Sequence, residues 1–81
     1  MSRGSSKDLL TLDLKAIGKR IRELRGFELS QAELAESLGI GQSYLSAIER
    51  GLKEPSATIL YRIAKFHGKT IEWLLTGIAE K

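Results

Sequence analysis

The chain has 81 residues, with 13 lysines and arginines against 10 acidic residues and no cysteine. It is the size of one domain with a small core, and without cysteine it contains neither a disulfide nor a thiolate that could bind a metal or act as a nucleophile. The formal net charge of +3 permits an anionic partner such as nucleic acid, although many domains without such a partner are equally basic.

The distribution of apolar residues excludes two kinds of segment. No stretch approaches the roughly 18 uninterrupted apolar residues of a transmembrane helix, and the N-terminal MSRGSSKDLL lacks the apolar core of a signal peptide. We therefore expect a cytoplasmic protein that does not enter a membrane. Residues 1–6 are small and polar, which predicts a flexible N-terminal arm, and residues 7–81 are expected to form a single domain.

The first predicted helix begins near Leu14 and ends at Arg25, where Gly26 is expected to stop it. Its apolar residues recur at intervals of three and four, which places them on one face of a helix. These residues are Leu14, Ile17, Ile21 and Leu24.

Two short helices follow with almost no chain between them. Ser30, with Glu33 three residues later, is a capping box and predicts the start of the second helix. Gly39 predicts its end. The third helix is expected from about Gln42 to Arg50, and Gly51 suits the left-handed residue after it. The apolar residues expected to face inward are Leu34, Ala35, Leu38, Leu45 and Ile48.

The last two predicted helices complete an all-α chain. Pro55 and Ser56 mark the start of the fourth, which ends near Gly68, and Thr70 is the expected N-cap of the fifth. No segment alternates between apolar and polar residues as a strand would, so we predict five helices and no sheet. The apolar stripes are Ile59, Leu60, Ile63 and Ala64 in the fourth helix and Ile71, Leu74 and Leu75 in the fifth.

The segment SQAELAESLGIGQSYLSAIERG, residues 30–51, resembles the helix-turn-helix of the lambda-repressor-like DNA-binding family, also called the Cro/cI or Xre family. IGKRIRELR before it, and EPSATILYRIAKFHG and IEWLLTG after it, extend the resemblance over about residues 14–77. It implies a five-helix lambda-repressor-like bundle whose third helix can enter the major groove of DNA. The sequence departs from the family in a shorter loop, RGFELSQ, and in Gly41, where the family often has a Ser or Thr N-cap.

The resemblance implies sequence-specific binding of double-stranded DNA by a small transcriptional regulator, and a repressor in particular. We expect a homodimer on a two-fold operator, because one recognition helix reads only a few base pairs. Its dimer surface is expected near the fifth helix, at Trp73 and Ile78. The alternative is a protein-interaction module, such as an antitoxin or an adaptor of a partner protein, which would expose large apolar residues on the third helix.

The resemblance places DNA contacts at the start of the second helix and along the third. Gln31 is expected at the phosphate backbone, whereas Gln42 is expected at base edges, because a glutamine amide can pair with N6 and N7 of adenine. Ala47 matches a position that reads bases and could touch a thymine methyl group. The complete set is Gln31, Gln42, Ser43, Tyr44, Ser46, Ala47, Arg50 and Lys53.

Some of these residues have a second interpretation. Tyr44 could pack on the fold or lie along a sugar-phosphate strand, and Arg50 and Lys53 could bind phosphates or simply favour the dipole at the end of the third helix. Arg25 and Glu49 fall where the family has an ion pair between the first and third helices, so we assign them to structure. With one histidine, no carboxylate pair in a cleft and no phosphate-binding loop, we expect no enzyme activity, metal or cofactor.

Overall fold

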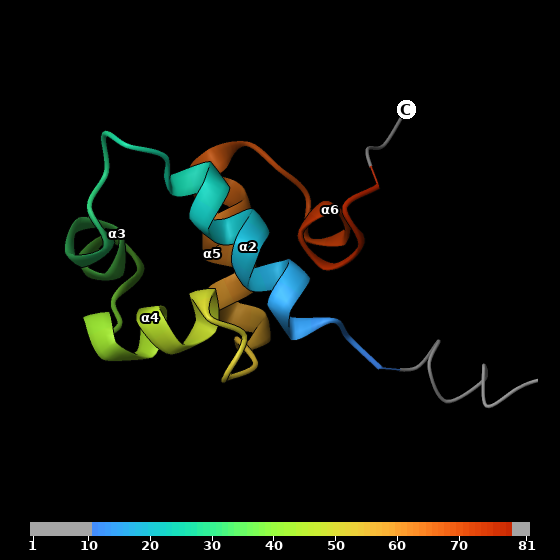
Figure 1. Ribbon diagram of the computed structural model, residues 1–81. Helices are drawn as coiled ribbons and strands as arrows, with labels where there is room; N and C mark the ends of the chain where they lie inside the picture. The colour runs from blue at the N-terminus through green and yellow to red at the C-terminus, as the bar shows by residue number, and fades with distance from the viewer. Residues whose placement is uncertain (1–10, 79–81) are drawn as a thin grey trace, which may run out of the picture.

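The computed structural model describes residues 11–78, so the arm predicted at residues 1–6 lies outside the described residues, as do both ends of the domain predicted at residues 7–81. Between residues 11 and 78 the chain contains five helices and no strand, which confirms the predicted all-α class (Figure 1). None of these five is long and apolar enough to cross a membrane. They are α2 (Leu14–Arg25), α3 (Gln31–Leu38), α4 (Gln42–Glu49), α5 (Ala57–His67) and α6 (Ile71–Thr76).

Side chains cap the N-termini of four of these helices, which explains why they begin where the sequence predicts. At α3 the capping box is reciprocal: Ser30 Oγ accepts the Glu33 N–H at 3.0 Å, and Glu33 Oε1 accepts the Ser30 N–H at 2.9 Å. By contrast, α4 begins after Gly41, which has no side chain to cap with. The caps of α2, α5 and α6 are Asp13, Ser56 and Thr70.

The end of α4 differs slightly from the prediction. Arg50, expected as the last helical residue, is instead the C-cap, and Gly51 follows in the expected left-handed conformation with φ 77°. A β-carbon at Gly51 would lie 2.8 Å from the Cα of Lys15. The end of α4 therefore rests directly on the start of α2, and only glycine fits there.

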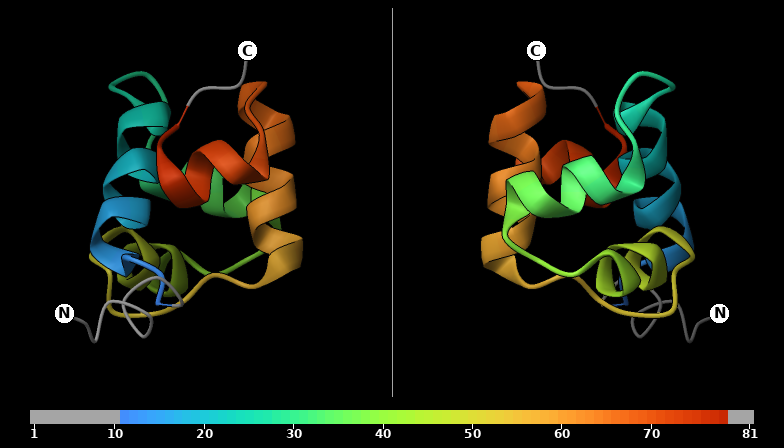
Figure 2. Two further views of the ribbon diagram at one scale, coloured as in Figure 1. Left: turned by 90° about the vertical axis from the view of Figure 1, so that its right-hand side faces the viewer. Right: turned by 90° about the vertical axis from the view of Figure 1, so that its left-hand side faces the viewer.

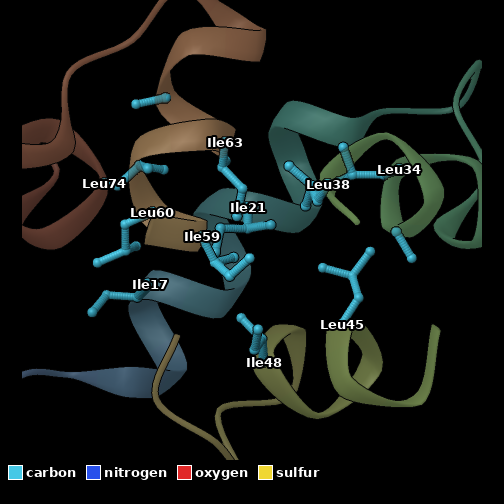
Figure 3. Packing of buried hydrophobic residues seen from close by; sticks show 12 residues of the cluster. Ile17, Ile21, Leu34, Leu38, Leu45, Ile48, Ile59, Leu60, Ile63 and Leu74 are labelled. Carbon is cyan, nitrogen blue, oxygen red and sulfur yellow. The ribbon is translucent and has the colours of Figure 1, made fainter. Parts of the chain in front are cut away.

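The core draws on all five helices, and Figure 3 shows its buried side chains meeting between them. Leu74 contributes from α6, and Leu14, Leu24, Ile71 and Leu75 pack at the edge of the core and are only partly buried. The apolar stripes predicted from sequence therefore do point inward. The buried set is Ile17, Ile21, Leu34, Ala35, Leu38, Leu45, Ile48, Ile59, Leu60, Ile63, Ala64 and Leu74.

The arrangement of α2, α3 and α4 fixes the direction of α4. In the right-hand view of Figure 2, α3 crosses the picture and α4 is seen nearly end-on below it, so their axes are far from parallel. Gly18 brings α2 close to α4, because a β-carbon there would lie 2.5 Å from the Glu49 carbonyl oxygen and would also collide with that of Ile48. Helix α4 is thus held against two other helices, and its N-terminal end points out of the molecule.

Candidate nucleic-acid interface

Helix α4 presents small polar side chains on its outer surface. Its inner surface is buried in the core through Leu45 and Ile48, so the helix cannot rotate without disrupting the packing. Apart from the partly exposed ring of Tyr44, the outer surface carries uncharged side chains without large apolar groups. Its residues are Gln42 and Ser43, which are exposed, and Ser46 and Ala47, which are half-exposed.

A chain of side-chain hydrogen bonds joins the tip of α4 to α3 and α2. Gln42 Nε2 donates to Gln31 Oε1 at 3.3 Å, and Gln31 Nε2 donates to Glu49 Oε1 at 3.0 Å. Glu49 also accepts two bonds from Arg25, one from Nε to Oε2 at 2.9 Å and one from Nη2 to Oε1 at 2.8 Å. The expected ion pair between Arg25 and Glu49 is therefore present, and both glutamines are linked to it.

Glu49 is the buried charge at the centre of this chain. Its side chain is 2% exposed, and that of Arg25 is 16% exposed. A carboxylate at this depth requires partners to remain charged, and Arg25 and Gln31 together donate three hydrogen bonds to it. The hydrogen bonds to Glu49 raise the pKa of the Arg25 guanidinium, whereas burial alone would lower it.

The charge of Glu49 determines which way both amides point. A carboxylate only accepts hydrogen bonds, so Gln31 must turn its NH2 group toward Glu49 and its carbonyl oxygen toward Gln42. Gln42 then donates one N–H to Gln31, and its second N–H and its carbonyl oxygen remain available for a ligand. One donor and one acceptor on the same amide are what N7 and N6 of adenine require.

Gln31 lies behind Gln42 rather than at an open edge of the molecule. It is half-buried, with its carbonyl oxygen and one N–H engaged by Gln42 and Glu49. Its second N–H remains available for a phosphate oxygen. The phosphate contact expected for Gln31 thus stays a prediction, and the hydrogen bonds add a positioning role that its place in the sequence did not reveal.

The other predicted residues lie along α4 and just beyond it. Tyr44 packs against the core and is half-exposed, which fits the packing interpretation while leaving part of the ring accessible. Arg50 and Lys53 are exposed, and neither forms an ion pair with any residue between 11 and 78. All eight predicted positions are therefore on α3, on α4 or in the segment that follows α4.

Sequence reasoning did not single out the basic residues of α2. Lys15, Lys19 and Arg22 line a groove of about 420 Å³ together with Arg50 at the end of α4. Their spacing of four and three residues is visible in the sequence and places them on one face of α2. The sequence does not show that this face borders α4.

The residues considered for metal or acid–base chemistry have other roles or lie apart. His67 Nδ1 is 3.1 Å from the Ile63 carbonyl oxygen, within the last turns of α5. In the described part of the chain no group of three or more histidine, aspartate or glutamate side chains could hold a metal ion. The hydrogen-bonded tip of α4 is therefore the candidate site.

Comparison with known proteins points to one family. The sequence profile described as helix-turn-helix matches residues 19–74. The transcriptional regulator SinR of Bacillus subtilis is 41% identical over 63 residues, which cover 73% of this chain and 55% of SinR. An uncharacterized HTH-type transcriptional regulator of Mycobacterium tuberculosis is 51% identical over 37 residues, which cover 46% of this chain and 26% of that protein. The chain thus spans about a quarter and about half of the lengths of these relatives.

The fold of a solved structure agrees with the sequence match. The P22 c2 repressor, crystallised with a synthetic operator, superimposes with a TM-score of 0.71 at 30% identity, over 76% of this chain and 96% of the repressor chain. The residues matched by the profile include the whole α3–α4 pair. The chain therefore belongs to the lambda-repressor-like helix-turn-helix family.

Proposed function

We propose that this chain binds double-stranded DNA sequence-specifically and regulates transcription, as a repressor. The observation that carries the proposal is the orientation of Gln42, whose amide projects at the exposed tip of α4 with one N–H and one carbonyl oxygen unused. The operator bound to the P22 c2 repressor and the regulator function named for SinR support DNA as the ligand.

In the proposed complex the tip of α4 enters the major groove, and Gln42 forms a bidentate pair with an adenine. Ser43 and Ser46 lie on the same surface and can bond to base edges or phosphates, and the methyl group of Ala47 suits a thymine methyl. The backbone contacts come from the remaining N–H of Gln31, from the exposed part of Tyr44, and from the unpaired cations Arg50 and Lys53.

The chain acts in this proposal as a cytoplasmic homodimer on a two-fold operator, with half-sites centred about 34 Å apart. Helix α6 and the residues just after it offer apolar area for the dimer: Trp73 in α6 is half-buried, and Ile78, beyond its C-cap, is 66% exposed. Binding should then be second order in protein below the dimerisation constant. A footprint on one half-site with first-order dependence would contradict the homodimer without contradicting DNA binding.

The alternative, a protein-interaction module, requires an apolar surface on α4. The large apolar side chains that are exposed between residues 11 and 78 all lie outside α4. The outer surface of α4 consists instead of an amide, two hydroxyl groups, a methyl group and the exposed part of the Tyr44 ring. This composition favours a DNA groove over a protein partner at that surface.

Selection of bound sequences from a random pool of duplex DNA tests the proposal. We expect enrichment of a two-fold motif that contains an adenine at the position read by Gln42. The substitution Gln42→Ala should reduce affinity for this motif by about 1 to 3 kcal/mol and relax the preference at that base pair in each half-site. The matched control is Ser37→Ala, which removes an exposed polar side chain near the C-terminal end of α3. It should change neither the affinity nor the base preference. An unenriched pool would overturn the proposal.

A further inference from the structure

The exposed face of α2 carries a row of positive charge beside the recognition helix. Lys15, Lys19 and Arg22 follow one another at intervals of four and three residues, so they form a single stripe about 10 Å long. Together with Arg50 they line the groove of about 420 Å³ between α2 and the end of α4. The acidic residues in its lining are Glu23, which is exposed, and Glu49, which is buried.

None of these four cations has a carboxylate partner within residues 11–78. The one ion pair in this part of the chain joins Arg25 to Glu49, so the Glu49 carboxylate is already neutralised. Two other arginines form hydrogen bonds to backbone carbonyl oxygens of the fold. Arg20 Nη1 donates to the Leu74 carbonyl oxygen at 2.7 Å, and Arg62 Nη1 donates to the Leu38 carbonyl oxygen at 2.8 Å. The groove cations are thus distinguished from these structural arginines by having no such partner.

We infer that this groove binds the phosphodiester backbone of the DNA strand that passes beside the recognition helix, with Lys15, Lys19 and Arg22 each facing a phosphate. The inference rests on the proposed function. A straight row of cations suits a linear polyanion better than a single small anion, around which charges would converge. The stripe is long enough to meet successive phosphates of one strand, and the long, flexible lysine and arginine side chains can adjust to the spacing of those phosphates.

The position of the groove supports this assignment. Glu49, the last residue of α4, and Arg50, its C-cap, line the groove. Glu49 also accepts the hydrogen bond from Gln31, which in turn accepts one from Gln42 at the tip of α4. The groove and the reading tip therefore occupy the same flank of α4. The close contact of Gly18 with the backbone at Ile48 fixes α2 against α4. The stripe is therefore pre-positioned relative to the helix that enters the major groove.

The salt dependence of DNA binding tests the inference. Each phosphate contact adds about 0.9 to the slope of log affinity against log salt, so Lys15→Gln with Lys19→Gln should make the slope less steep by about 1.8 per protomer. Between about 50 and about 200 mM salt, the double variant should then lose about 12-fold less affinity per protomer than the unmodified chain. Its preference among single-base variants of the motif should be unchanged, because phosphate contacts carry no sequence information.

Further single variants distinguish an effect of where a charge lies from an effect of the net charge of the protein. Lys65→Gln removes an exposed lysine from α5 and should leave the slope unchanged, whereas Lys19→Gln alone should lower it by about 0.9. Glu23→Gln removes the exposed acid of the groove and should raise affinity at low salt. Thermal unfolding confirms that each variant is folded. Equal slopes for Lys19→Gln and Lys65→Gln would overturn the inference while leaving sequence-specific binding intact, whereas no binding by the unmodified chain would overturn the proposed function itself.

Discussion

Replacing Arg25 by alanine tests whether the buried ion pair holds α2, α3 and α4 together. The substitution removes two of the three hydrogen bonds to Glu49 and leaves a carboxylate that is 2% exposed with only Gln31 as a donor. Breaking a buried pair on one side costs about 3 to 5 kcal/mol, and since the Arg25 side chain keeps 16% exposure we expect about 3 kcal/mol. For a domain of this size that corresponds to a fall in Tm of about 12 to 24 °C.

Thermal and denaturant unfolding of Arg25→Ala, Glu49→Gln and the double variant would measure the coupling between the two residues. Arg22→Ala, an exposed arginine on the same helix without an ion-pair partner, is the matched control and should change stability by under about 0.5 kcal/mol. A loss below about 1 kcal/mol for Arg25→Ala, as for an exposed pair, or an absence of coupling, would refute the assignment of Glu49 as a buried, charge-dependent anchor.

The pH dependence of this stabilisation follows from the direction of the pKa shift. Glu49 raises the pKa of Arg25 in the folded state, so the contribution of the Arg25 proton is complete below the ordinary guanidinium pKa and is lost only as pH rises through the folded value. Because the raised pKa of Arg25 lies far above neutral pH, Arg25 itself should cause no change in stability between about pH 6 and about pH 9. Denaturant midpoints across that range provide the measurement.

Three further substitutions address the packing and the site. Gly18→Ala should destabilise the fold by more than about 1 kcal/mol in denaturant unfolding, because the added methyl group would meet the backbone at Ile48. Ser30→Ala should cost about 1 kcal/mol in the same measurement through loss of the capping box, with base preference unchanged. Gln31→Ala should both weaken DNA binding and relax the preference at the base pair read by Gln42, because Gln42 loses the acceptor that orients it. Uniformly weaker binding to all single-base variants would instead make Gln31 a phosphate contact only.

The helices could be predicted from sequence because their signals are local. The capping box at Ser30, the stop at Gly39 and the left-handed Gly51 each depend on the chain within a few residues, and all are observed as expected. Helix α4 ends at Glu49, one residue before the approximate end predicted at Arg50. Helix ends fray between a last turn and a cap, so single residues there are poorly specified by composition.

The connections within the site could not be read from spacing. Gln31 and Gln42 belong to different helices, and their hydrogen bond exists only because α3 and α4 converge on Glu49. The Arg25–Glu49 pair was expected only from the family resemblance, since nothing in the sequence around either residue indicates that its side chain is buried. Likewise, the stripe that includes Lys19 looks in sequence like an ordinary solvated helix face, and only the crossing of α2 and α4 makes it one wall of a groove.

The central claim, that Gln42 reads an adenine through its unused N–H and carbonyl oxygen, is tested most directly by a double-substitution cycle between protein and DNA. One partner is Gln42→Ala, and the other is 7-deazaadenine placed at each adenine of the selected operator, which removes the N7 acceptor. We predict that at one adenine per half-site the modified base weakens binding of the unmodified chain by about 1 to 2 kcal/mol and does not weaken binding of Gln42→Ala at all. Equal losses for both proteins at every adenine would contradict the claim.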